Sequence, residues 1–212
     1  MSLHVSPASA ADAPRSVAIE DAAYGPNPSG AAMFPGPFPP GDQVRVNALR
    51  TQLADDPACR WAKVVDSGLE AAGEDGMVAF SMWYFWSTPR DTLPPRPAWG
   101  PGTNPDACEL FFGAMREEWL RRWAGKPHVY LKQLHTDPAH QRRGAGSMLL
   151  KWGVAEADRL GLPTYLEATE EGRPLYEKHG FRPVGKLVTD LSEWNGPAEA
   201  ETVLMVRPPS ES

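Results

Sequence analysis

The chain has 212 residues, of which 42% are hydrophobic and 23 are prolines, and its formal net charge is −6. This length suits one domain with a full hydrophobic core, and the proline content is roughly twice the usual share. The acidic balance argues against a general nucleic-acid-binding protein, because such proteins carry a basic surface. We therefore expect no nucleic-acid partner, although a local basic pocket is compatible with this charge.

Cys59 and Cys108 are accompanied by neither a CxxC spacing nor a histidine cluster. We therefore expect no metal site and two buried, reduced thiols, with a disulfide between them as the alternative. Residues 1–16 lack a basic segment followed by an apolar run, so they do not resemble a signal peptide. No window approaches the ~18 apolar residues of a membrane-spanning helix. These features predict a soluble, cytoplasmic protein without a membrane partner.

The first half of the chain predicts strands and helices around a proline-rich connection at 25–42. Ser9 is a suitable cap for the first helix and Gly25 a suitable stop. The connection also contains Phe and Met, so two interpretations stay open: a loop that covers a pocket, or an irregular packed segment. The expected elements are a strand at 3–5, helices at 9–25 and 43–56, and strands at 60–67 and 76–86.

A second proline-rich loop, at 87–105, precedes a regular alternation of helices and strands. This alternation, without internal repeats, predicts a single mixed α/β domain over 1–212. Asp106 lies near the expected start of the helix that follows the loop, and Gly125 lies at its end. The expected elements are helices at 106–125, 146–161 and 173–180 and strands at 128–137, 164–169, 181–191 and 201–207.

The segment 144–146, Gly-Ala-Gly, lies between a predicted strand and a predicted helix, directly after Arg142 and Arg143. Unpaired backbone N–H groups at a helix N-terminus favour an anion, glycines allow close approach, and arginines add charge-assisted hydrogen bonds. A Walker A loop would need a lysine before Ser147, and a Rossmann fingerprint would need glycine in place of Leu149. The pattern indicates a phosphate site of another kind; a solvated arginine pair at an ordinary helix start is the alternative.

Residues 141–146, Gln-Arg-Arg-Gly-Ala-Gly, match the Q/R-x-x-G-x-G/A signature of the GNAT acetyltransferases. The resemblance extends over 130–185, and residues 3–25 are similar to the opening strand and helix of that fold. The second half looks most like small-molecule N-acetyltransferases of the puromycin-acetyltransferase type and their fungal relatives. The resemblance implies an α/β (α+β) GNAT fold: a central mixed, mostly antiparallel sheet, splayed between two strands and flanked by helices.

The resemblance also implies acetyl-CoA as the cofactor. In the family, a strand bulge, which corresponds to residues 134–136 here, exposes backbone groups to the pantetheine arm. The signature loop, residues 142–147 here, binds the pyrophosphate. For His135, a packing or hydrogen-bonding role is the alternative. The implied cofactor-binding residues are Leu134, His135, Thr136, Gln141, Arg142, Arg143, Gly144, Ala145, Gly146, Ser147 and Tyr176.

Acetyl transfer to an amine needs an acid for the leaving thiolate and a base for the amine proton. The resemblance assigns the acid to Tyr176, for which a core tyrosine is the alternative. Some relatives carry a glutamate on the strand before the signature, but Tyr130 occupies that position here. Glu167, on the strand expected beside the cofactor strand, is the first substitute, and a charge pairing with a neighbour at the end of the sheet is the alternative for it. A water chain is another option, and weaker carboxylate candidates are Glu109, Glu117 and Asp137.

The strand expected at 76–86 is aromatic on both faces, which is typical of a buried strand. Aromatic residues in or beside the proline-rich loops favour a second interpretation, an aromatic acceptor pocket for an apolar or aryl amine. The candidate substrate-binding residues are Phe34, Trp86, Trp99 and Tyr130.

These features together predict an N-acetyltransferase that moves acetyl from acetyl-CoA to the primary amine of a small molecule by direct attack. Two alternatives stay open: a non-catalytic acyl-CoA-binding or sensing protein on the same fold, and an acetyltransferase of proteins or peptides. We expect a monomer or a homodimer.

Overall fold

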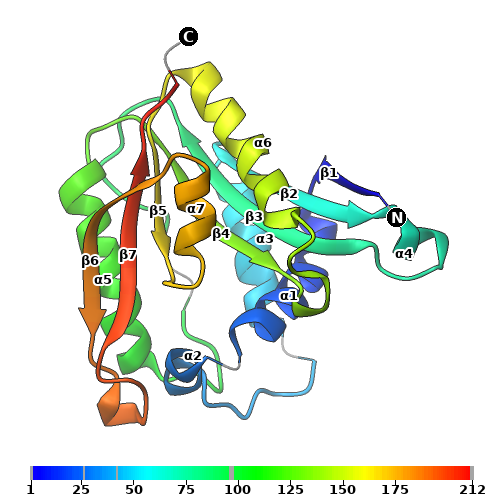
Figure 1. Ribbon diagram of the computed structural model, residues 1–212. Helices are drawn as coiled ribbons and strands as arrows, with labels where there is room; N and C mark the ends of the chain where they lie inside the picture. Colours follow the sequence, from blue (N-terminus) through cyan, green and yellow to red (C-terminus); the bar gives the residue numbers. More distant parts are fainter. Residues whose placement is uncertain (1, 26, 42, 96–97, 211–212) are drawn as a thin grey trace.

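A computed structural model describes residues 2–25, 27–41, 43–95 and 98–210. Within these residues seven strands form one sheet in the order β1-β2-β3-β4-β5-β7-β6 (Figure 1). Neighbouring strands are antiparallel except β4 and β5, which are parallel. The predicted mixed, mostly antiparallel sheet is therefore confirmed. The strands are β1 (Leu3–Pro7), β2 (Cys59–Asp66), β3 (Met77–Trp86), β4 (His128–Thr136), β5 (Thr164–Ala168), β6 (Arg182–Thr189) and β7 (Ala200–Arg207).

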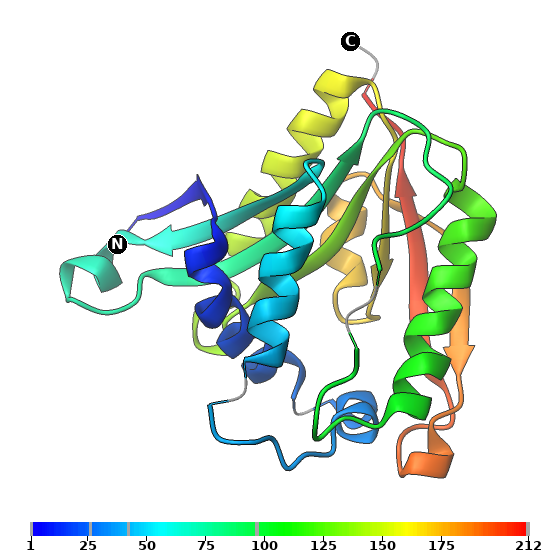
Figure 2. The same ribbon diagram turned by 180° about the vertical axis from the view of Figure 1, so that it is seen from behind.

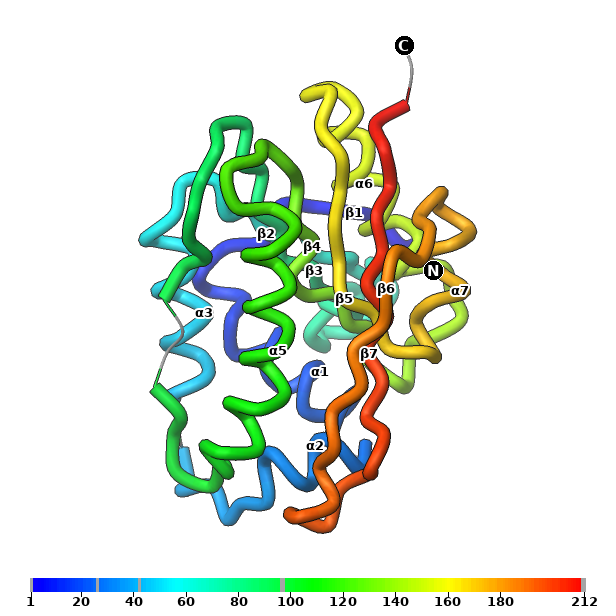
Figure 3. The backbone as a smooth tube through the Cα atoms, turned by 90° about the vertical axis from the view of Figure 1, so that its left-hand side faces the viewer, coloured from blue at the N-terminus to red at the C-terminus, as the bar shows by residue number. Residues whose placement is uncertain are grey.

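Helices cover both faces of the sheet. The longer helices α1, α3 and α5 lie on one face, whereas α6 and α7 lie on the other (Figures 1, 2 and 3). The short helix α4 follows β2 at the far end of the β2–β3 hairpin. The helices are α1 (Ala13–Tyr24), α2 (Pro28–Met33), α3 (Val44–Asp55), α4 (Ser67–Ala71), α5 (Pro105–Trp123), α6 (Ala145–Leu160) and α7 (Arg173–Lys178). None of the described helices is both long and apolar enough to span a bilayer.

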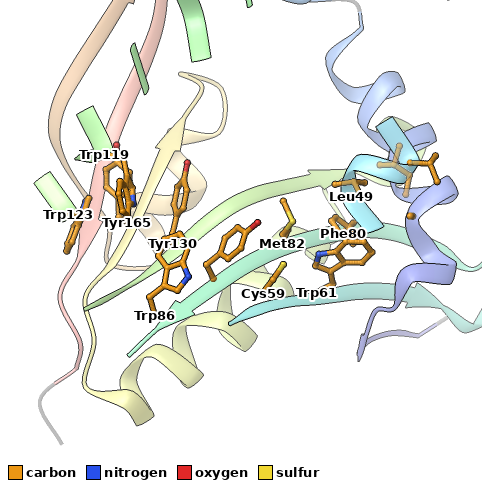
Figure 4. Packing of buried hydrophobic residues seen from close by; sticks show 14 of the residues in the cluster. Leu49, Cys59, Trp61, Phe80, Met82, Trp86, Trp119, Trp123, Tyr130 and Tyr165 are labelled. Atoms are coloured by element: carbon orange, nitrogen blue, oxygen red, sulfur yellow. The ribbon is translucent and has the colours of Figure 1, made fainter. Parts of the chain in front are cut away.

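All ten residues of β3 are buried, because this central strand is covered on both faces. On the face of α1, α3 and α5, β3 contributes Phe80, Met82, Tyr84 and Trp86 to one core (Figure 4). On the other face, Trp83 and Phe85 pack in a second core with residues of α6 and α7. Period-two alternation thus supplies both cores from a single aromatic strand.

The two proline-rich segments are only partly irregular. The first contains α2, which Asn27 caps and which packs on α5 through Ala32 and Cys108. The second ends at Pro105, the first residue of α5, which Asn104 caps, and Asp106 lies in the first turn as expected. Cys59 and Cys108 are buried and form no disulfide.

Strands β4 and β5 diverge after a short paired stretch. Only three residue pairs join them, from Val129↔Thr164 to Leu131↔Leu166, and beyond these the strands separate (Figure 1). At the same point the register with β3 shifts, because Met82 faces Gln133 whereas Trp83 faces Leu131. Lys132 is therefore an extra residue, and such a bulge bends a strand away from its neighbour. The bulge that the resemblance implied for 134–136 lies earlier, at Lys132.

Candidate active site

The expected anion site lies at the start of α6. Gly144 has φ +90° and is the N-cap, and the first helical bond joins the Met148 N–H to the Gly144 carbonyl. The N–H groups of Ala145, Gly146 and Ser147 therefore point out of the helix end, as the first N–H groups of any helix do. Their position and the helix dipole suit a phosphate or diphosphate group.

The two arginines before this helix have different environments. Arg143 donates a hydrogen bond of 2.6 Å to Asp66 at the end of β2 and another of 3.1 Å to His140. Arg142 has φ +62°, and its exposed guanidinium has no hydrogen bond or ion pair with any of the described residues. Arg143 thus fixes the loop to the sheet, whereas Arg142 is the arginine that a phosphate group can bind.

Ser147 and the residues before the loop have structural partners of their own. Ser147 Oγ and His179 Nε2 share a hydrogen bond of 3.0 Å that joins α6 to the end of α7. The Gln141 side-chain amide donates to the Thr136 carbonyl over 3.4 Å. These contacts hold the loop and both helices in one arrangement around the anion site.

Backbone groups of β4 are open where β5 has diverged. The Asp137 N–H donates to Val78 on β3, so by antiparallel alternation the N–H and carbonyl of Leu134 and Thr136 point away from β3. The Leu134 carbonyl instead accepts a hydrogen bond of 3.0 Å from the Tyr24 hydroxyl, at the end of α1. This arrangement places an exposed strand edge directly before the anion site.

His135 belongs to the core. Its side chain is 3% exposed, stacks on Phe80 with ring centroids 5.4 Å apart, and hydrogen-bonds Ser16 Oγ through Nε2 at 3.2 Å. Burial lowers the pKa of His135 to about 4, so the imidazole is neutral near pH 7. The packing alternative for this side chain is the one that agrees with these contacts.

Glu167 lies on β5 at the point of divergence. Its Oε2 accepts a hydrogen bond of 2.6 Å from the hydroxyl of Tyr130, which also accepts one of 3.1 Å from the Lys132 ammonium. Glu167 Oε1 is buried without a hydrogen-bond partner among the described residues. Burial raises the pKa of Glu167, although the nearby Lys132 charge and the hydroxyls of Tyr130 and Tyr165 act in the opposite direction. A carboxylate of raised pKa with one unoccupied oxygen is suited to accept a proton.

Tyr176 lies on the α6 and α7 face of the sheet, whereas Glu167 bonds to Tyr130 on the opposite face. It is buried in the core formed with α6 and packs edge-on against Phe181, with ring centroids 5.9 Å apart. Burial raises the pKa of Tyr176 well above its usual value, and the neighbouring Tyr24 adds to this effect. The phenol therefore keeps its proton at neutral pH, as a general acid must.

A second carboxylate, Glu20 on α1, was not among the predicted site residues. Arg45 donates two hydrogen bonds to it, of 2.7 and 2.8 Å, and Gln133 Nε2 donates a third of 2.9 Å. Glu20 and Tyr24 are four residues apart on one helix and so share a face, and both reach β4. The four-residue spacing of Glu20 and Tyr24 at the end of the predicted helix is the sequence signal that could have identified them.

The predicted aromatic residues do not form one pocket. Trp86 is 4% exposed and packs against Trp119 and Tyr130, and its indole N–H donates to Asp56. Tyr130 is buried as well, at 1% exposure. Phe34 and Trp99 lie elsewhere, beside α5.

Phe34 and Trp99 contact a common residue of α5. Their ring centroids lie 6.4 and 5.7 Å from that of Phe112, which also packs edge-on against Phe111. Phe34 remains partly exposed. Of the predicted aromatic residues, these two on the proline-rich segments are therefore the ones near a surface.

The weaker carboxylate candidates lie away from Glu167. Asp137 forms an ion pair of 2.7 Å with Arg15 and caps the turn after β4 through the Ala139 N–H. Glu109 and Glu117 line a shallow cavity of about 310 Å³ on α5 together with Leu110 and Arg116. Neither position brings a carboxylate to the β4–β5 divergence.

Comparisons with known proteins agree with this architecture. Residues 107–181 match the model of the Acetyltransferase (GNAT) family. The probable acyltransferase SID5 of Ajellomyces capsulatus is 29% identical over 92 residues. That match covers 43% of this chain and 62% of SID5, less than two thirds of its length.

Solved structures share the fold. One is described as histone acetyltransferase HPA2 and related acetyltransferase from Corynebacterium glutamicum; its TM-score is 0.60 at 24% identity, covering 100% of this chain and 99% of that one. A phosphinothricin acetyltransferase from Sinorhizobium meliloti, solved with AcCoA, has a TM-score of 0.58 at 14% identity, covering 100% and 91%. At these identities the likeness concerns the fold alone.

Proposed function

We propose that this chain is an acyltransferase of the GNAT family that acetylates the primary amine of a small molecule with acetyl-CoA. The match of residues 107–181 to the GNAT family model and the similarity to SID5 support acyl transfer. The main support for an amine acceptor is Glu167, a buried carboxylate whose Oε1 has no hydrogen-bond partner among the described residues. An amine nucleophile must lose a proton, and a carboxylate of raised pKa is a suitable acceptor near neutral pH.

The residues before and within the signature loop fit coenzyme A. The N–H groups of Ala145, Gly146 and Ser147 and the Arg142 guanidinium would hold its pyrophosphate. The edge of β4 at Leu134 and Thr136 has no strand partner where β5 has diverged, and it would take the pantetheine amides in place of the Tyr24 and Gln141 side chains that the two carbonyls bind here. When bound, the cofactor supplies an acetyl thioester whose carbonyl carbon is the electrophile.

The proposed transfer uses Glu167 as the base and Tyr176 as the acid, from opposite faces of the sheet. Glu167 would accept the proton that leaves the amine nitrogen as that nitrogen bonds to the acetyl carbon. The Tyr176 phenol would donate a proton to the sulfur as the carbon–sulfur bond breaks, and would regain one from solvent. The high pKa of Tyr176 keeps that proton available.

The acceptor would enter on the face of the sheet that carries Glu167. Phe34 and Trp99, which share Phe112 as a neighbour, are the proposed apolar contacts for its side chain. Trp86 and Tyr130 instead support this face from within the core.

The test is a mass-spectrometric screen for acetylated products, in which purified protein and acetyl-CoA are incubated with small amines, including phosphinothricin, and with a peptide library. The proposal predicts acetylation of at least one small amine and loss of that product in Glu167→Gln. Acetylation confined to peptide N-termini or lysines would overturn it in favour of a protein acetyltransferase. Acetyl-CoA binding without transfer to any amine would overturn it as well.

A further inference from the structure

The bulge in β4 changes which side chains face the candidate base. Successive strand residues normally point to opposite faces, but the extra residue at Lys132 places Lys132 and Gln133 on one face. The Lys132 ammonium lies 5.3 Å from the Tyr130 ring centroid, and Gln133 binds Glu20 on α1. Lys132 shares this face with Tyr130, two residues earlier, by the normal alternation, and the bulge adds Gln133 to it.

A short chain of hydrogen bonds joins this cation to the carboxylate. The Lys132 ammonium has no acceptor capacity, so it donates to the Tyr130 oxygen at 3.1 Å. The Tyr130 hydroxyl has one proton, which it donates to Glu167 Oε2 at 2.6 Å. The direction of both hydrogen bonds is therefore fixed, and Tyr130 occupies Oε2. Oε1 is the Glu167 oxygen that remains for an acceptor amine.

Among the described residues, the other charged groups near Glu167 have partners of their own. Glu20, which also interacts with the Lys132 charge, is neutralised by Arg45. On β5, Tyr165 is the further ionisable neighbour of Glu167. Behind Tyr165, on α5, Glu118 is paired with Arg121 and Arg122. Lys132 is the positive charge that acts most strongly on the buried Glu167.

We propose that Lys132, acting through Tyr130, is a positioning residue that holds Glu167 ionised and oriented with Oε1 toward the acceptor amine. The inference rests on the proposed function, since it assigns a partner to the proposed base. An opposite charge within about 4–6 Å of a carboxyl group lowers its pKa by about one to three units. Without Lys132, burial would leave Glu167 protonated over a wider pH range and unable to accept the amine proton.

The test compares Lys132→Met, Lys132→Arg and the control Lys126→Met, which removes a lysine before the start of the same strand. For the best amine from the screen, the acid limb of kcat/KM against pH should move upward by about one unit or more in Lys132→Met. Lys132→Arg, which keeps the positive charge, and Lys126→Met should both show the wild-type acid limb of kcat/KM. Acetyl-CoA affinity, measured by calorimetry, should be unchanged in all three variants.

A second readout does not depend on turnover. In protein labelled with ¹³C at glutamate carboxyl groups, the signal that disappears in Glu167→Gln reports Glu167 directly, and its titration midpoint should rise in Lys132→Met. An unchanged midpoint, or equal acid limbs in Lys132→Met and wild type, would overturn the inference. If no amine is acetylated, the proposed function fails, whereas the titration still decides the role of Lys132.

Discussion

The phenol hydroxyl of Tyr24, at the end of α1, donates a hydrogen bond of 3.0 Å to the backbone carbonyl of Leu134, at the open edge of β4. Although 41% of the Tyr24 surface is exposed, partial burial and the charge of Glu20 raise the pKa of its phenol, so the phenol remains a donor at neutral pH. In the proposed complex the pantetheine arm needs the same carbonyl. Under this proposal, the Tyr24 hydroxyl competes with the cofactor for the Leu134 carbonyl.

Tyr24→Phe should bind acetyl-CoA about threefold to tenfold more tightly, because a neutral hydrogen bond worth about 1 kcal/mol no longer competes. Calorimetry measures the affinity. Adenosine 3′,5′-bisphosphate lacks the pantetheine arm and should bind both proteins equally. Equal affinities for acetyl-CoA would mean that the cofactor does not use the Leu134 carbonyl.

Gly144→Ala should weaken acetyl-CoA binding at least tenfold. Gly144 and Gly161 flank α6 with φ of +90° and +65°, and a Cβ at either position meets no atom within 4 Å. Both substitutions should therefore cost about 1–2 kcal/mol of unfolding free energy through backbone strain alone. Only Gly144 lies at the anion site, so Gly161→Ala is a matched control. Equal cofactor affinities in the two variants would contradict the assignment.

Arg142→Ala and Arg143→Ala should separate cofactor binding from stability. Loss of Arg142 should weaken acetyl-CoA binding about tenfold, since it removes a charge-assisted hydrogen bond, and should leave thermal stability unchanged. Calorimetry in low and high salt tests this effect, which added salt should reduce. A loss of affinity confined to Arg143→Ala would reverse the two roles.

Loss of Arg143 should lower the thermal midpoint at neutral pH, because it removes the partner of Asp66. The Arg143 hydrogen bond is the main cause that lowers the pKa of Asp66. The stabilisation is therefore present above the unfolded pKa, near 4, and disappears as the pH falls through the lower folded value. Thermal melts of wild type and Arg143→Ala should converge in acid; a constant difference from pH 7 to 3 would exclude this cause.

Trp99→Ala should raise the acceptor KM severalfold with little change in acetyl-CoA affinity, since Trp99 is a proposed acceptor contact beside Phe112. Trp86→Ala should instead cost about 3–5 kcal/mol of unfolding free energy, as truncation of a buried core tryptophan does. Steady-state kinetics and urea unfolding distinguish the two. A selective KM effect in Trp86→Ala, at unchanged stability, would restore the original pocket hypothesis.

Local chemistry made much of the fold predictable. The start of α6 was readable because glycine supplies a positive φ at a helix end and the strand before it was clear. The bulge at Lys132 was not, because it depends on the register between β3 and β4. Glu20 and Gln133 are 113 residues apart, so no local pattern joins them. The burial of Trp86 agrees with the buried-strand interpretation of 76–86, because aromatic residues on both faces are typical of a strand that is covered on both faces, as β3 is.

The central claim is that Glu167 removes the amine proton during acetyl transfer. Its most direct test is the pH dependence of kcat/KM for the best amine in wild type and Glu167→Gln. The account predicts a rate about 10²- to 10⁴-fold lower in Glu167→Gln, with the acid limb of the wild-type profile abolished and acetyl-CoA affinity unchanged. A variant that keeps the wild-type rate and the same acid limb would contradict the account.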